Sequence, residues 1–186
     1  MKARLKNEEL WLSLLTVLFL TGLYALVVYW TRKIPAAGSL FGHTVGIIGS
    51  ILMLMAETLY SFRKRSKRAR WGSMEGWLKF HIFTGLVGPY MVLLHSSWKF
   101  HGLAGAATLL TFLIVLSGFV GRYIYTRIPR TLDPNESLDP ARTAELAKYR
   151  QRLSVWHAIH IPLGMALFAA ALIHAGAALY YTSLLH

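Results

Sequence analysis

Long apolar stretches separated by short polar segments dominate this chain. An apolar run of about 20 helical residues is enough to cross a bilayer core of about 30 Å. Five runs reach that length, over residues of about 10–30, 40–62, 77–98, 104–125 and 154–181. The pattern therefore predicts an all-α integral membrane protein, with residues 1–186 forming a single five-helix transmembrane bundle.

Two details of this prediction concern the first apolar run and the polar segment before the fifth run. The first run is longer than the apolar region of a typical secretion signal, and Arg32 and Lys33 follow it directly. We therefore expect it to be retained as a membrane span. The polar segment before the fifth run predicts a short, separate surface helix over residues 141–151.

Lysines and arginines are unevenly distributed among the segments that join the runs. Sixteen of the twenty lie in the N-terminal segment, in residues 63–70 or in residues 122–152, whereas only three lie in the opposite connections. Basic connections stay on the cytoplasmic side of a membrane. The distribution predicts a cytoplasmic N-terminus and an external C-terminus, and we expect the membrane to be the bacterial inner membrane. The third and fifth spans would then run in parallel, from inside to outside.

The composition narrows the chemistry that this bundle can carry. The chain has no cysteine, which excludes cysteine-ligated iron–sulfur clusters, disulfides and covalently attached haem. A net charge of +12 would by itself fit a nucleic-acid partner. The charges lie between membrane spans, however, where they act as orientation signals, so we expect membrane lipid and no nucleic acid.

Two of the apolar runs each carry a pair of histidines fourteen residues apart, His81 with His95 and His160 with His174. Fourteen residues turn an α-helix by about 1400°, about 40° short of four turns, so the two histidines of a pair share one face about 21 Å apart. If the two helices run in parallel, His81 lies level with His160. His95 then lies level with His174. Four such imidazoles predict two bis-histidine sites for haem b, one in each leaflet, with no open position for oxygen.

Other readings of the histidines stay open. His157 competes with His160, although its spacing of seventeen residues from His174 places it about 100° around the helix. Structural zinc is less suitable because it needs four ligands at one point. Some of the histidines could instead relay protons, bind quinone or simply pack. His43 and His101, on the outer side, could line a quinone site, contact a haem propionate, hold a third haem between them or have no special role.

Charged and small residues near these histidines offer further contacts. Haem propionates are anionic, so Lys79 at the start of the third run is a candidate partner. Glu57 in the second run could relay protons during quinone chemistry or pair with a basic residue of the 63–70 segment. Glycines at positions 42, 46 and 49 form a stripe that permits close approach of either a helix or a flat ligand.

The two histidine helices resemble the haem-binding core of cytochrome b from the quinol–cytochrome c oxidoreductases, and equally the transmembrane domain of ferric reductases and NADPH oxidases. Pro162, two residues after His160, is similar to the proline of the second haem helix of cytochrome b. Gly85, four residues after His81, is similar to the first. The segment SGFVGRYIYTRIPR, residues 117–130, resembles bacterial membrane cytochromes that serve redox complexes. The resemblance, which covers residues of about 40–182, implies Gly85, Gly118 and Arg122 as cofactor contacts.

The chain also departs from both families. It lacks the Pro-Glu-Trp-Tyr sequence of the cytochrome b quinol site, and no flavin or nicotinamide domain follows the bundle. We expect an electron-transfer subunit of an oxidoreductase, not a complete enzyme. It would connect a quinone pool with a cytochrome c, an iron–sulfur protein or a flavoprotein. The alternatives are a ferric or other metal reductase core fed by a separate flavoprotein, and a haem-free metal or proton transporter or assembly protein.

Overall fold

The computed structural model of the protein describes residues 7–65, 72–128 and 140–184. The described residues form α1 (Glu8–Thr31), α2 (Leu40–Arg65), α3 (Met74–His95), α4 (Gly102–Tyr125) and α5 (Pro140–Leu184). All five helices are long and apolar enough to cross a membrane. The prediction of an all-helical protein with five candidate spans is therefore confirmed. Much of the basic 63–70 segment lies outside the described residues.

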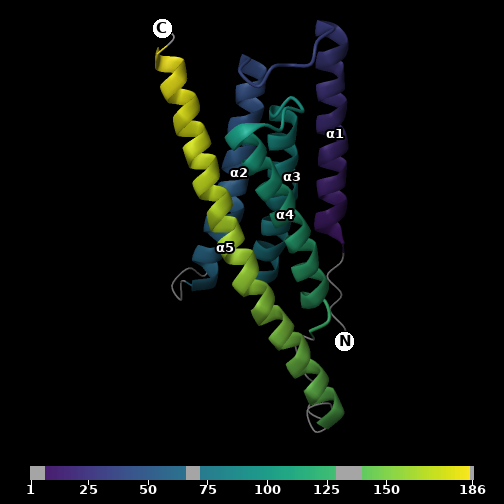
Figure 1. Ribbon diagram of the computed structural model, residues 1–186. Coiled ribbons are helices and arrows are strands. Elements are labelled where there is room, and N and C mark those ends of the chain that lie inside the picture. The colour runs from purple at the N-terminus through teal and green to yellow at the C-terminus, as the bar shows by residue number, and fades with distance from the viewer. Residues whose placement is uncertain (1–6, 66–71, 129–139, 185–186) are drawn as a thin grey trace.

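The helices alternate in direction along the bundle, and the two termini lie at its opposite ends (Figure 1). As a result α3 and α5, which carry the paired histidines, run in the same direction (Figure 1). The helix α3 packs mainly against α2, and α5 packs mainly against α4, while α1 contacts α3. Within the described residues, α3 and α5 are not among the helix pairs with extensive backbone contact. The two histidine helices are therefore held apart by their neighbours.

Large apolar side chains cover the outside of the bundle. Phe19 of α1 is 70% exposed, Leu109 of α4 is 59% exposed and Leu172 of α5 is 71% exposed. Exposing so much apolar surface to water would be costly, at about 25 cal/mol per Å². The outward-facing apolar surface agrees with a multi-pass membrane protein.

The ends of α3 differ from the predicted limits of residues 77 and 98. The helix begins at Met74 because the hydroxyl of Ser73 accepts a hydrogen bond from the N–H of Gly76 at 3.0 Å, which caps the first turn. It ends at His95 because Ser97 and Trp98 adopt positive φ angles of 50° and 62°, which a right-handed helix cannot contain. Trp98 is therefore in the following turn.

The helix α5 is one continuous element of 45 residues. Residues 141–151 are helical, as predicted, but they join the fifth span without a break instead of forming a short helix of their own. No glycine or proline occurs between Pro140 and Pro162, so nothing local interrupts the helix. At 1.5 Å per residue it is about 67 Å long, roughly twice a bilayer core. Its N-terminal part extends beyond the other helices (Figure 1).

Close packing of α2 on α3 depends on glycine. A Cβ added at Gly49 would lie 2.9 Å from the backbone oxygen of Gly88, and one added at Gly88 would lie 2.9 Å from that of Gly49. Neither position has room for a side chain. The predicted glycine stripe of α2 therefore serves helix packing at this point, and this packing fixes the rotation of α3.

Candidate functional site

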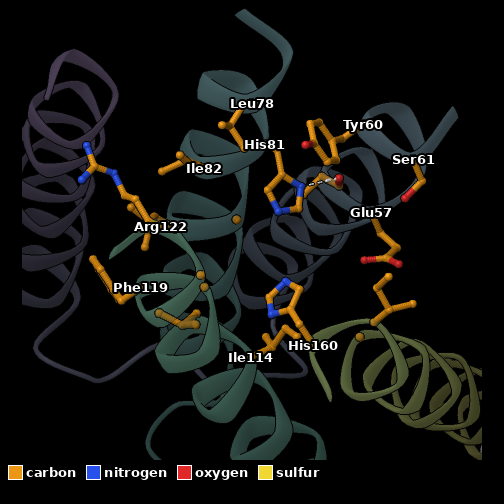
Figure 2. A pocket seen from close by; sticks show the side chains of 18 of the residues that line it. Glu57, Tyr60, Ser61, Leu78, His81, Ile82, Ile114, Phe119, Arg122 and His160 are labelled. Atoms are coloured by element: carbon orange, nitrogen blue, oxygen red, sulfur yellow. Dashed lines mark hydrogen bonds between the residues drawn. The ribbon is translucent and has the colours of Figure 1, made fainter. Parts of the chain in front are cut away.

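A cavity of about 580 Å³ lies among α2, α3, α4 and α5, and His81 and His160 line it. The end of the bundle with His81 and His160 is here called the inner level, and the end with His95 and His174 the outer level. His81 projects from α3 and His160 from α5, and their rings point toward one another across the cavity (Figure 2). The remaining lining is mostly apolar, as in sites for cofactors, and the volume falls within the range of about 300–1,000 Å³ typical of them. The cavity occupies the space that remains because α3 and α5 are held apart.

The ring of His81 is oriented by the backbone of α2. Its Nδ1 lies 2.7 Å from the carbonyl oxygen of Ala56. A carbonyl can only accept a hydrogen bond, so Nδ1 carries a hydrogen, and in the neutral ring Nε2 then keeps a free lone pair. The ring of Tyr60 lies 5.1 Å from it, centre to centre. A histidine whose Nδ1 hydrogen is bound by a backbone carbonyl is in the form that metal-binding histidines adopt.

His160 is held by two side chains instead. Its Nδ1 lies 2.9 Å from the hydroxyl oxygen of Ser117 on α4. The indole of Trp156, one turn earlier on α5, stacks on the imidazole with ring centres 4.5 Å apart and planes at 28°. The indole N–H donates to the Ser117 carbonyl at 2.7 Å and also reaches its hydroxyl at 3.1 Å. Gly121 makes room for this indole, because an added Cβ there would collide with it.

The outer histidines are also neighbours. The rings of His95 and His174 lie 6.5 Å apart, centre to centre, at 69°. Two imidazole nitrogens each about 2 Å from one metal ion would place the ring centres roughly 6 Å apart. The angle between the planes is unrestricted, since each ring can rotate about its own bond to the metal. The separation of the two rings therefore suits axial ligation of one metal ion.

One helix supplies the hydrogen-bond acceptors for both histidines of α3. Nδ1 of His95 lies 2.9 Å from the carbonyl oxygen of Gly42, just as Nδ1 of His81 contacts Ala56. Gly42 and Ala56 are themselves fourteen residues apart. Both histidines of α3 therefore have the same protonation pattern, imposed by two turns of the α2 backbone with the same spacing.

Glycines open the wall of the inner cavity. A Cβ added at Gly85 of α3 or at Gly118 of α4 would meet nothing within 4 Å, and both residues line the cavity. Packing therefore does not require glycine at either position. In contrast, Gly88 and Gly121 on the same two helices have no space for a Cβ. Gly85 and Gly118 leave open surface where a flat ligand could lie against the backbone.

The charged residues proposed as cofactor contacts already have acidic partners. Lys79 forms ion pairs with Glu8 at 3.1 Å and with Glu75 at 3.4 Å and is not among the residues lining the cavity. Arg122 does line it, and its guanidinium donates to the buried carboxylate of Glu9 at 2.7 Å. Arg122 is the better placed of the two toward the cavity, but its charge is largely balanced by Glu9.

The other candidate residues are distributed between the two ends. His157 and Glu57 line the inner cavity, and the Glu57 carboxylate lies against Gly164 of α5. His43 approaches the outer pair, with its ring centre 6.3 Å from that of His95. His101 precedes α4 and is exposed. The roles of these four residues stay predictions.

Within residues 7–65, 72–128 and 140–184, no cluster of three or more histidine, cysteine, aspartate or glutamate side chains could hold a metal ion. A haem needs only two axial ligands from the protein, and each level of the bundle has two histidines.

A second, almost wholly apolar cavity of about 450 Å³ lies among α1, α3 and α4. No protein-family model, curated protein or solved structure matches the chain.

Sequence reasoning did not find the residues that orient the histidines. Trp156 carried a readable signal, because it lies four residues before His160 and so on the same helical face. The carbonyls of Gly42 and Ala56 carried none, since every residue has a carbonyl. Ser117 was part of the segment that resembles membrane cytochromes, but only the packing of α4 on α5 shows its contact with His160.

Proposed function

We propose that the chain is a dihaem b-type cytochrome of a multi-pass membrane complex, and that it passes electrons between a quinone pool and a partner redox protein. The observation that carries the proposal is the inner cavity. His81 and His160 face one another across it (Figure 2), and two glycines that packing does not require open its wall. Those features are what a flat, axially ligated cofactor needs.

Each of the two levels would hold one haem between a histidine of α3 and a histidine of α5. At the inner level, the contact with Ala56 leaves Nε2 of His81 free, and His160 faces it from α5. At the outer level, His95 and His174 have the separation expected for a shared metal ion. When bound, two bis-histidine haems would supply one-electron transfer without a position for substrate. The protein residues would hold the rings, exclude water with the apolar lining and set the distance between the two levels.

The vertical arrangement supports transfer across the membrane. The two histidines of α3 are fourteen residues apart, so the two sites lie about 21 Å apart along the helix. In the orientation suggested by the basic segments, the inner site faces the cytoplasm and the outer site faces the opposite side of the bacterial inner membrane. Electrons would enter at one site and leave at the other, and each end requires a partner.

The first experiment is the visible spectrum and the haem content of the purified chain. A reduced α-band of a b-type cytochrome with two haems per chain is the expected result. The electron donor then separates the two redox functions. Reduction of the haems by a quinol would indicate a quinone-linked subunit, whereas reduction by a reduced flavoprotein would indicate a metal-reductase core. A purified chain that binds no haem would contradict the proposal and would favour a haem-free transporter or assembly protein.

Single histidine variants test the pairing. His174→Ala should remove the outer haem and leave the inner one, and His160→Ala should do the reverse, because each haem has one ligand from α3 and one from α5. Redox titration of each variant identifies the component that is lost. If His81→Ala and His174→Ala eliminated the same component, the assignment of pairs by level would be wrong.

A further inference from the structure

Ser117 occupies a special position beside the inner site. Within the described residues, Nδ1 contacts a hydrogen-bonding partner in three of the four paired histidines. The partner is a backbone carbonyl for His81 and His95, and it is a hydroxyl for His160. A carbonyl dictates which nitrogen carries the hydrogen, because it has none to donate. A hydroxyl can either donate or accept. The protonation of His160 therefore depends on what else binds the Ser117 hydroxyl.

Trp156 makes the second contact with that hydroxyl. An indole N–H can only donate a hydrogen bond. The Ser117 hydroxyl oxygen, 3.1 Å away, is therefore the acceptor in this contact. The Ser117 hydroxyl keeps a second lone pair, which can accept the Nδ1 hydrogen of His160 at 2.9 Å, and it also has a hydrogen of its own, which Nδ1 could accept instead. Iron binding through Nε2 of His160 requires the first arrangement. The same indole stacks on the imidazole at 4.5 Å. Serine, indole and imidazole thus form one closed cluster between α4 and α5.

We propose that Ser117 is the positioning residue of the inner site: its hydroxyl accepts the Nδ1 hydrogen of His160 and leaves Nε2 free to bind the haem iron. This inference rests on the proposed function, since it concerns how His160 acts as a ligand. A hydrogen bond from Nδ1 raises the basicity of a metal-binding imidazole, and removal of such a partner typically weakens metal binding 10–100-fold. A more basic axial ligand favours the ferric over the ferrous state.

Ser117→Ala isolates this contact well. The indole N–H keeps its shorter hydrogen bond, 2.7 Å to the backbone carbonyl of residue 117, so Trp156 can stay in place. Only the hydroxyl that serves His160 is lost. Ser117→Thr keeps a hydroxyl and tests rescue. Thr108→Ala is the matched control, because this hydroxyl on the same helix donates to the carbonyl of Ala104 in its own helix.

The measurements are haem content and a redox titration of the full-length protein in detergent. In Ser117→Ala we expect the inner haem to bind 10–100-fold more weakly and its midpoint potential to rise. A tenfold change in the ferric preference corresponds to about 59 mV for one electron. The outer haem, held by His95 and His174, should not change and serves as an internal control. Ser117→Thr should restore the inner potential, and Thr108→Ala should leave both haems unaltered.

A second readout does not require haem. The ¹⁵N-histidine NMR signal of His160 in the haem-free protein can be assigned, because it disappears in His160→Gln. In the wild type this signal should show the hydrogen on Nδ1. In Ser117→Ala a larger fraction of the His160 rings should carry the hydrogen on Nε2. An inner potential unchanged in Ser117→Ala, or a His160 hydrogen on Nε2 in the wild type, would overturn the inference. Loss of both haems in Ser117→Ala and in Ser117→Thr would also overturn it, by showing a purely structural role. A wild-type chain without haem would instead refute the proposed function, and the NMR result would still decide the role of Ser117.

Discussion

Replacing the two open glycines should separate helix stability from cofactor binding. A Cβ at Gly85 or Gly118 would meet nothing within 4 Å, so alanine adds no clash to the haem-free protein. Alanine is favoured over glycine in a helix interior by about 0.8–1.0 kcal/mol. Gly85→Ala and Gly118→Ala should therefore each stabilise the haem-free protein by about that amount. This gain should appear as a higher midpoint in thermal unfolding.

A larger side chain at the same two positions should instead reduce haem binding. A leucine at either position projects into the cavity of about 580 Å³ and occupies the surface against which a flat ligand would lie. Gly85→Leu and Gly118→Leu should thus lower the haem content from two to one per chain, with loss of the inner redox component. Gly22 and Gly176 are matched controls: a Cβ at either meets nothing within 4 Å, and neither lines this cavity.

The two halves of this prediction fail in different ways. If Gly85→Leu retained two haems with an unaltered spectrum, the inner cavity would not be the haem site. If the alanine variants destabilised the haem-free protein while Gly22→Ala did not, the open space beside the two glycines would be an incorrect description of the packing. Gly88→Ala should be destabilising in either state, since its Cβ would lie 2.9 Å from the backbone of α2.

Three further predictions follow from the geometry. Gly46→Leu should remove the outer haem alone, because a Cβ at position 46 would lie 2.7 Å from the His95 ring; haem content and redox titration measure this, and loss of the inner component instead would contradict it. Arg122→Leu should lower the free energy of unfolding by about 3 kcal/mol, because it leaves the Glu9 carboxylate, only 1% exposed, without its partner. This value is the lower end of the range for breaking a buried ion pair. An unchanged denaturation midpoint would argue against this. A reporter fused after Lys99 should lie outside the cytoplasm, and a cytoplasmic signal would reverse the assignment of inner and outer sites.

The length of the apolar runs was sufficient to predict the five helices of the fold. Spans follow from apolar length, and the shared face of His81 and His95 follows from the pitch of one helix, because both are properties of a single continuous segment. The same reasoning placed His160 and His174 on one face of α5. It was wrong about the interruption near residue 151, where the change from polar to apolar residues was taken for a break although no glycine or proline occurs there.

The tertiary structure decided how these faces meet and what each neighbouring residue does. Gly85 and Gly88 are three residues apart in one helix, yet one opens a cavity and the other packs on a backbone. The contacts of His160 with Ser117 and of His81 with Ala56 join residues 43 and 25 positions apart. Such contacts depend on the rotation and separation of whole helices, which are set by the sum of side-chain packing between them. A local pattern has no information about that sum, so the sequence alone determined the helices and their histidine faces, and only packing determined the cavity and the partners of the rings.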